Sequence, residues 1–273
     1  MNTMSKCGQK KFIVYAYFTL CIRNSFPIFM LQKIKSMKTC LLALSALLLI
    51  TAAKAQTADE IIAKHIDALG GKDLLAKITS VYLESSTAVM GNDAPTKTSV
   101  IIGKGYKNET DFNGQNIVQV ITDKSGWAIN PFAGASDATA MSDDDYKASS
   151  DAVFLPDPLV NYAANGGKVE LAGQEKVGDI DAYKIKYTNK YGLETVYYID
   201  PTTYYIIQSV KKGMAMGQEV TVTASISNYQ KTDFGVFMPF SINIDMGQFS
   251  LAITTKKAEI NGTIDPTIFD MPK

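Results

Sequence analysis

The chain has 273 residues, of which 46% are hydrophobic and 20% charged, and its 27 basic and 27 acidic side chains give a formal net charge of zero. The balance is uneven: residues 1–55 hold eight of the basic side chains and no acid, which leaves residues 56–273 with 19 lysines, no arginine and 27 acids. A body with a negative net charge and no guanidinium group lacks the clustered basic residues that neutralise phosphates, so we predict no nucleic-acid binding.

The segment over residues 37–55 is predicted to be an export signal. One lysine near its start precedes an apolar run over residues 40–53, and small residues close the segment. This pattern is typical of a secretory signal peptide that is cleaved between Ala55 and Gln56. The apolar run is shorter than the roughly 20 residues that a membrane-spanning helix needs. We therefore predict no stable transmembrane segment and a periplasmic location.

Residues 1–36 precede this signal and are basic. We interpret Met37 as the true start of the protein and residues 1–36 as a disordered leader that comes from the gene model. If the leader is translated, it adds a basic cytoplasmic stub and leaves the function of the body unchanged.

The use of cysteine and histidine excludes most metal and nucleophile chemistry from the body. All three cysteines lie in the first 55 residues, so residues 56–273 can hold neither a disulfide nor a thiolate metal site. His65 is the single histidine, which excludes multi-histidine zinc sites and leaves one position for Ser-His catalysis. We predict no metal, no cofactor and no enzymatic activity, and leave open a hydrolase that depends on His65.

A helix is predicted directly after the signal. Thr57 and Glu60 form a capping box, and Gly70 with Gly71 ends the helix. His65 lies at the border of the apolar face, and we interpret it as a partly buried structural residue. A second short helical piece is predicted over residues 72–78. The apolar residues of the first helix recur at helical spacing and are Ile61, Ile62, Ile66 and Leu69.

From Ser80 onward the chain has the pattern of successive β-hairpins. Val, Ile, Thr and Tyr are abundant, turn signals recur about every ten residues, and no linker or repeat is found. We predict about ten antiparallel strands in one domain over residues 56–273, with one dry and one wet face. The clearest apolar alternations are Val220, Val222, Ala224 and Ile226, then Ile242, Ile244 and Met246. The turn signals are residues 91–93, 113–114, 123–126, 189–192, 200–201, 211–213, 231–235 and 246–248.

One segment between the strands, residues 141–165, is predicted to be helical. It begins with Asp143, Asp144 and Asp145, which suit a helix N-terminus. The spaced ligands of a calcium loop are missing, so we assign these acids to capping. This segment and the first helix are the only cover that the pattern offers for the dry face. The sheet therefore either closes tightly on itself or curves around a partly filled apolar space.

The order of these features resembles a known family. The signal, the helix ending in two glycines, the early strands and the helical insertion are followed by characteristic segments at 177–185, 197–207, 235–240 and 266–272. Together they resemble the outer-membrane lipoprotein-sorting proteins of the LolA/LolB-like superfamily over essentially the whole body. The resemblance implies a mainly β (α+β) fold. This is a strongly curved antiparallel half-barrel whose N-terminal helix and helical insertion plug the concave face.

The resemblance also implies a hydrophobic cavity that shields acyl chains in the periplasm. Lipoprotein carriers of this type are associated with a cavity arginine, and their partner at the outer membrane carries an acylated cysteine. The body of this chain has neither residue. The resemblance therefore carries over the fold more directly than the cargo.

From these observations we predict a periplasmic carrier or chaperone that binds lipid acyl chains or an acylated lipoprotein. Each methylene moved from water into an apolar site gains about 0.8 kcal/mol, which favours an acyl chain as cargo. The alternative is an envelope protein-binding or sensing module with a filled core and no lipid cargo. The residues assigned to the cavity and its lid, for which core packing stays open, are Trp127, Phe132, Phe154, Leu155, Leu159, Tyr162, Met214, Met216, Met238 and Met246.

Overall fold

The structure is a computed structural model that describes residues 56–272, apart from residues 90, 216, 217 and 248. The leader over residues 1–36, the export signal over 37–55 and Ala55 at the cleavage site lie outside the described residues, and Gln56 is the first residue described. Within the described part of the chain, no helix has both the length and the apolar character needed to cross a membrane.

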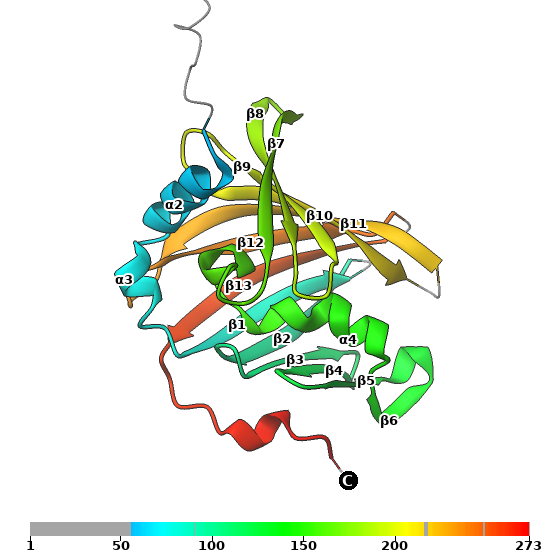
Figure 1. Cartoon of the computed structure of the whole chain (residues 1–273). Coiled ribbons are helices and arrows are strands. Elements are labelled where there is room, and N and C mark those ends of the chain that lie inside the picture. The colour runs from blue at the N-terminus through cyan, green and yellow to red at the C-terminus, as the bar shows by residue number, and fades with distance from the viewer. Residues whose placement is uncertain (1–55, 90, 216–217, 248, 273) are drawn as a thin grey trace, which may run out of the picture. The chain divides into compact units, whose positions relative to one another are not determined.

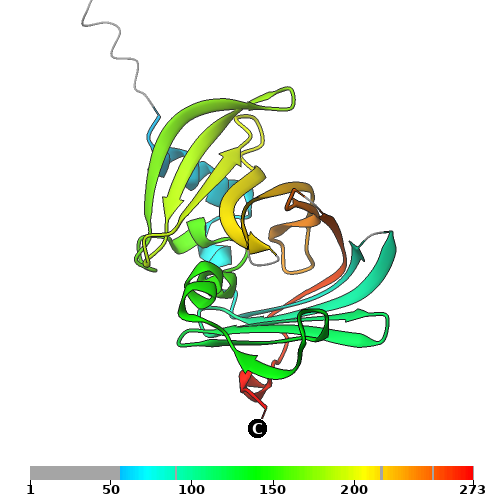
Figure 2. The ribbon, with the colours of Figure 1, turned by 90° about the vertical axis from the view of Figure 1, so that its right-hand side faces the viewer.

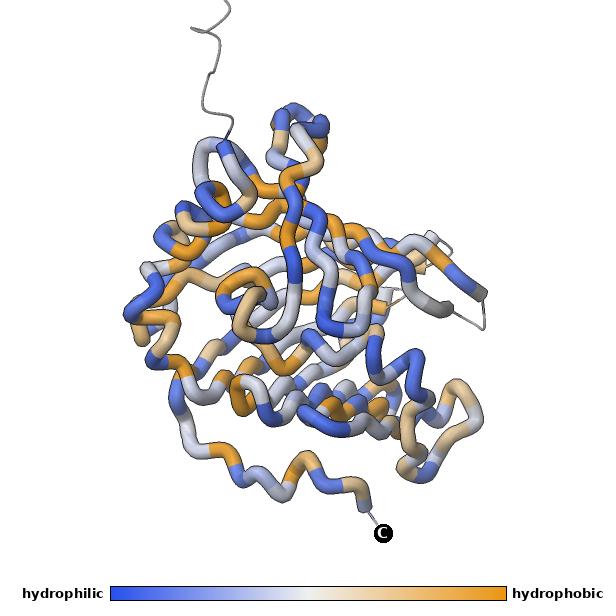
Figure 3. Tube along the Cα trace, viewed as in Figure 1, coloured by the Kyte–Doolittle hydropathy of each residue, from blue (hydrophilic) through white to orange (hydrophobic). Residues whose placement is uncertain are grey.

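A single antiparallel sheet of thirteen strands forms most of the structure (Figure 1). Figure 3 shows hydrophobic and hydrophilic residues alternating along many of its strands, which follows from the two-residue period of a β-strand. The strands are β1 (Ser80–Val89), β2 (Asn92–Ile101), β3 (Gly105–Phe112), β4 (Gln115–Thr122), β5 (Gly126–Asn130), β6 (Ala135–Ala140), β7 (Lys168–Val177), β8 (Ile180–Thr188), β9 (Glu194–Ile199), β10 (Ile206–Ala215), β11 (Gln218–Lys231), β12 (Phe237–Asp245) and β13 (Ser250–Ile260).

The strand order divides the sheet into two meanders. Strands β1 to β6 run outward to one edge, strands β7 to β13 return from the other edge, and the halves join where β1 pairs with β13. The connection from β6 to β7 therefore has to cross from one edge of the sheet to the other. This connection is the helical insertion, formed by α4 (Asp143–Ser149), η2 (Ser150–Val153) and η3 (Pro158–Asn161). Figure 2 shows the sheet curving around it.

The architecture confirms the prediction of a mainly β, curved antiparallel sheet with few helices, but the prediction of about ten strands is wrong. Residues 211–213, interpreted as a turn, lie inside β10, where Gly213 pairs with Val220. The short edge strand β6 and its short neighbour β5 lack a clear alternation of apolar and polar residues. The turn between β2 and β3 has Gly103 as its single glycine, with a φ of 71°. These signals are too weak to delimit a strand from sequence.

The predicted N-terminal helix and its cap are confirmed. Helix α2 (Ala58–Ala68) begins after Thr57, whose hydroxyl accepts a hydrogen bond from the Glu60 amide at 3.2 Å. The Glu60 carboxylate accepts one from the Thr57 amide at 3.1 Å. Gly70 and Gly71 then take positive φ values of 125° and 90°, which favour glycine, and helix α3 (Lys72–Leu75) is shorter than the predicted piece.

The helices pack on the concave face of the sheet and fill one end of it. Ile61 and Ile62 of α2 and Leu159 of η3 are buried against strands β8 to β10. A second cluster joins Leu69 and Leu75 to Val81 and Val100 on β1 and β2. At this end the core is therefore closed by side chains.

The opposite, convex face has a cover of its own. The C-terminal η4 (Pro266–Phe269) returns below strands β3 to β5 (Figure 1) and buries Phe269 with Val118, Val120 and Trp127. The Trp127 indole N–H donates a hydrogen bond to the Phe269 carbonyl at 2.9 Å. A Cβ on Gly105 would lie 2.7 Å from the Phe269 ring, so glycine is needed there.

Candidate functional site

The concave face carries six aliphatic residues on β11, β12 and β13 that we call the aliphatic strip. Its members face one another across the strands, because Ala224 pairs with Ile244 and Ile244 with Leu251. All six are half-buried, and none belongs to the four clusters of buried side chains found among the described residues. The strip consists of Val222, Ala224, Ile242, Ile244, Leu251 and Ile253.

The pairing register places the strip on the side of the sheet where the helices pack. Ile253 pairs with Thr87 of β1, and Thr87 is on the same side of β1 as Val81, which is buried beneath the helices. The residues between the strip positions, such as Asn243 and Thr254, are exposed on the other face. The alternation predicted from sequence for β11 and β12 is therefore confirmed.

A ladder of hydroxyl and amide groups lies beside the strip on β1, β2 and β3. The Thr96 hydroxyl is 2.8 Å from that of Thr87 and 3.0 Å from that of Thr110. The Asn108 amide donates to the Thr98 hydroxyl at 2.9 Å. These side chains satisfy one another, so the part of the concave face beside the strip is polar, while the apolar cluster around Val81 and Val100 lies further along the same strands.

Lys211 on β10 borders the strip on its other side, opposite Val222. Burial lowers the pKa of the Lys211 amine, and the nearby Asp151 carboxylate of η2 opposes this effect. Asp151 itself accepts hydrogen bonds from the Tyr187 hydroxyl at 3.1 Å and the Asn189 amide at 3.3 Å. Burial raises the pKa of the Asp151 carboxyl despite these bonds.

His65 on α2 contacts Asp157 of the insertion and so joins the two elements. Its side chain is fully buried, its Nδ1 lies 2.7 Å from the Tyr204 carbonyl, and its Nε2 lies 3.0 Å from the Asp157 carboxylate. A carbonyl and a carboxylate only accept hydrogen bonds, so both contacts are satisfied when the ring carries two protons. Asp157 also caps η3 by accepting from the Leu159 amide at 2.9 Å. His65 is thus more deeply buried than the sequence indicated.

The pKa of His65 follows from this environment. Burial alone lowers it, but the charge of Asp157 and the hydrogen bonds to Asp157 and Tyr204 outweigh burial and raise the pKa above its ordinary value. When its ring is protonated, His65 forms an ion pair with Asp157 at 3.0 Å, and the His65 side chain in this pair is fully buried.

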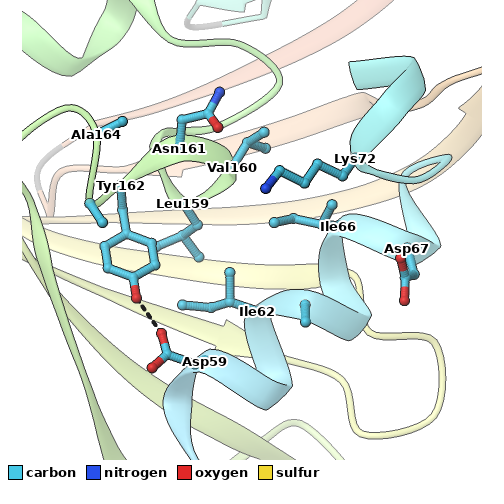
Figure 4. Close-up of a pocket in the computed structure, with 12 residues that line it drawn as sticks. Asp59, Ile62, Ile66, Asp67, Lys72, Leu159, Val160, Asn161, Tyr162 and Ala164 are labelled. Carbon is cyan, nitrogen blue, oxygen red and sulfur yellow. Dashed lines mark hydrogen bonds between the residues drawn. The ribbon is translucent and has the colours of Figure 1, made fainter. Parts of the chain in front are cut away.

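A cleft of about 450 Å³ separates α2 from η3 (Figure 4). Figure 4 shows Ile62 and Leu159 facing each other across it and the Tyr162 hydroxyl bonded to Asp59, which closes one side. Lys72 reaches the same cleft from α3. Its volume lies within the range of roughly 300–1,000 Å³ of ordinary ligand sites. The cleft is a groove between the helical elements, and the core beneath it is closed by buried side chains such as Ile61 and Leu159.

The structure brings the predicted lid residues of the insertion together on the concave side. Leu159 and Tyr162 line the cleft, and Phe154 packs beside Tyr146 in the cluster next to α4. Leu155 and the buried Met238 belong to the central cluster beneath α2 and α3.

The other predicted site residues lie elsewhere. Trp127 is buried on the convex face and Phe132 is 57% exposed beside Phe112, so neither faces the insertion residues across a cavity. β5 directs Trp127 to the same face as its partner Val120, and that face is sealed by the C-terminal tail. Met246 is half-buried after β12. The side chain of Met214 and the whole of Met216 lie outside what the structure describes.

Sequence reasoning missed Lys211, Asp157 and the threonine ladder as features of the site. Lys211 was hidden by its interpretation as part of a turn. Asp157 lies 92 residues from His65, and a single sequence offers no signal for that pairing. The alternation of Thr96 and Thr98 with Lys97 and Ser99 was detectable, but threonine is typical of either face of a strand.

Comparison with known proteins places this geometry in a fold. No protein-family model and no curated protein matches the chain. Among solved structures, it is similar to a LolA superfamily protein from Nitrosomonas europaea, with a TM-score of 0.53 and 11% identity over 80% of this chain and 99% of that one. It is also similar to a domain assigned as an outer membrane lipoprotein-sorting protein from Vibrio parahaemolyticus, with a TM-score of 0.50 and 12% identity over 77% and 95%. The chain therefore has a LolA-like fold.

Proposed function

We propose that the chain is a non-enzymatic periplasmic carrier that binds an acyl chain of a lipid or lipoprotein on the concave face of its sheet. The observation that carries the proposal is the aliphatic strip. Six inward-facing aliphatic side chains stay half-buried outside the packed clusters, where each methylene of a bound chain would gain about 0.8 kcal/mol on leaving water. The helical insertion is the element that covers this ligand.

Three further features support this proposal. The LolA-like fold is that of a protein and a domain whose names refer to LolA and to lipoprotein sorting. The export signal predicted over residues 37–55 fits a role in the periplasm. The single histidine has both ring nitrogens engaged with Tyr204 and Asp157, so no free base is offered for hydrolysis.

Filling the strip tests the proposal. Ala224→Phe would place a ring on the concave strip, whereas Ser225→Phe places the same ring one residue along on the opposite face. Protein purified from cells would be extracted with organic solvent, and the extract analysed by mass spectrometry. We expect lipid to copurify with the wild-type protein and with Ser225→Phe, and the amount to fall at least about tenfold for Ala224→Phe.

Two outcomes contradict the proposal. The first is an extract without lipid from the wild-type protein, combined with no uptake of a fluorescent fatty acid. The second is equal lipid recovery from both folded variants, which would place the lipid away from the strip. A lipid-free protein that forms a complex of fixed stoichiometry with an envelope protein would instead support the alternative docking function.

A further inference from the structure

Lys211 is directed to the concave side of the sheet. Lys211 of β10 pairs with Thr195 of β9, and Thr195 is on the same side of β9 as Tyr197. Tyr197 is buried in the cluster beneath α2 and η3 on the concave side. The next residue, Lys212, points to the opposite face and pairs with Glu219 at 3.0 Å. The two adjacent lysines therefore lie on different faces.

Lys211 lies on the concave face without a close anionic partner. Its side chain is exposed to water, yet the protein around it desolvates the amine. Within the described part of the chain, no carboxylate lies within 4.0 Å of its Nζ. The Asp151 carboxylate attracts the Lys211 ammonium group from further away and already accepts hydrogen bonds from Tyr187 and Asn189. A partly desolvated ammonium group without a close partner is a favourable position for an anion.

The aliphatic strip begins at this amine. Val222 is the cross-strand neighbour of Lys211, and β12 and β13 continue the strip away from it. Neighbouring strands are about 4.8 Å apart, so the strip extends roughly 14 Å from Lys211 to Leu251. One cation at the end of one line of aliphatic side chains matches a molecule with one charged end and one long apolar tail.

We infer that the concave face takes a long-chain carboxylate, a fatty acid, with its acyl tail along the aliphatic strip and its carboxylate paired with Lys211. This inference rests on the proposed function. It adds that the cargo has a single acyl chain and a single negative charge. A neutral ligand would leave the ammonium group unpaired beside the tail. A dianionic head group would face repulsion from Asp151, which approaches from the insertion.

Two ligands of equal length and different charge test this inference. Dodecanoate and dodecanol would compete with the neutral fluorescent probe N-phenyl-1-naphthylamine for the exported protein at pH 7.5. We expect dodecanoate to bind at least about tenfold more tightly than dodecanol, which corresponds to one charge-assisted contact. Intrinsic fluorescence is unsuitable as the readout, because the single tryptophan, Trp127, is buried on the convex face.

Variants test whether the preference for dodecanoate over dodecanol depends on the Lys211 amine. We expect the ratio of the two affinities to fall to about one in Lys211→Met, and to be kept in Lys211→Arg and in the matched control Lys212→Met on the other face. Circular dichroism of each variant shows that it is folded.

Four results would overturn the inference. Equal affinity of the wild-type protein for both ligands, or a preference that survives Lys211→Met, removes the role of Lys211 while the carrier function stands. Tighter binding of dodecyl phosphate than of dodecanoate rejects the carboxylate as the preferred head group. Failure of the probe and both ligands to bind removes the proposed function together with the inference.

Discussion

Replacing Asp157 with asparagine is expected to abolish a pH dependence of stability that the buried His65 imposes. In the wild-type protein the imidazole donates to two acceptors, and its pKa is raised above the ordinary value of about 6.5. A group whose pKa is higher in the folded state stabilises that state fully below its unfolded pKa. This contribution is lost as the pH rises through the folded pKa. The wild-type protein should therefore become less stable from pH 6 upward.

The size of this pH dependence is set by the one extra proton that the folded state binds at His65. The free energy of unfolding falls by at most about 1.4 kcal/mol per pH unit for one extra bound proton. His65 is the single histidine and all cysteines lie in residues 1–55, so His65 is the one side chain of residues 56–273 whose ordinary pKa lies in the window from about pH 6.5 to 8. Burial lowers the pKa of Lys211 and raises that of Asp151, which moves both toward the window, but Asp157 is not a cause of either shift, so both groups act alike in the wild-type protein and in Asp157→Asn. Nearby Tyr197 and Tyr229 have pKa values raised by burial, which moves them further from this window, and Lys64 has a raised pKa.

Asparagine has the same shape as Asp157, but with asparagine at this position the His65 ring no longer needs a second proton to satisfy both of its contacts. Its carbonyl oxygen can still cap η3, and its amide can donate to the neutral Nε2 of His65, so both contacts survive without the charge. Asp157→Asn should therefore be less stable than the wild-type protein at pH 6 and approach it at higher pH. Its stability should change little with pH.

Urea unfolding followed by circular dichroism at pH 6, 7, 8 and 9 measures these slopes. Asp59→Asn is the matched control, because it removes a carboxylate that bonds the insertion through Tyr162 without touching His65. The control should keep the wild-type slope, and a terminal amine contributes equally to all three proteins. A wild-type stability that is flat or rises with pH, or an Asp157→Asn variant with the wild-type slope, would refute the assignment of a buried histidine cation.

The remaining predictions concern the two ends of the body. Phe269→Ala should destabilise the protein by about 3–5 kcal/mol in urea unfolding and shift the Trp127 fluorescence to longer wavelength, whereas Met271→Ala, at an exposed position, should change neither. Gly105→Ala should cost about 1–3 kcal/mol, because its Cβ would meet the Phe269 ring. The cost should shrink in the double variant with Phe269→Ala, and strict additivity would contradict the contact. Thr57→Ala should cost about 1 kcal/mol through the lost cap, and an unchanged unfolding midpoint would show that the cap contributes nothing.

Features that depend on local sequence were predictable. The cap of α2 is built from Thr57 and a residue three positions later, and the strip on β11 and β12 follows a two-residue period. Both patterns are complete within one element, so the sequence contains all the information that they need. The general fold class then followed from counting turns and helices.

Features that depend on contacts between distant segments were not predictable from one sequence. Trp127 was expected at a cavity, because nothing near it indicates that the C-terminal tail returns to cover it. The tail offered one signal, the apolar residues Ile264, Ile268 and Phe269 at the end of the chain, which suggest a segment that packs. The ion pair of His65 with Asp157 had no comparable signal.

The topology of the sheet explains why the cover lies where it does. Because β6 and β7 form opposite edges, any chain that joins them has to cross one face of the sheet, and the curvature makes the concave face the shorter route. The insertion is held to α2 by His65 with Asp157 and by Tyr162 with Asp59. Both contacts lie at the end of the concave face that is already packed, so they can break without disturbing the pairing of either meander. The other end of the insertion is held as well, because the Tyr146 hydroxyl donates to the Thr122 carbonyl at 3.2 Å and Asp151 accepts from Tyr187 and Asn189. The insertion is therefore fixed to both meanders, and loading of the acyl chain that we propose would require these contacts to open too.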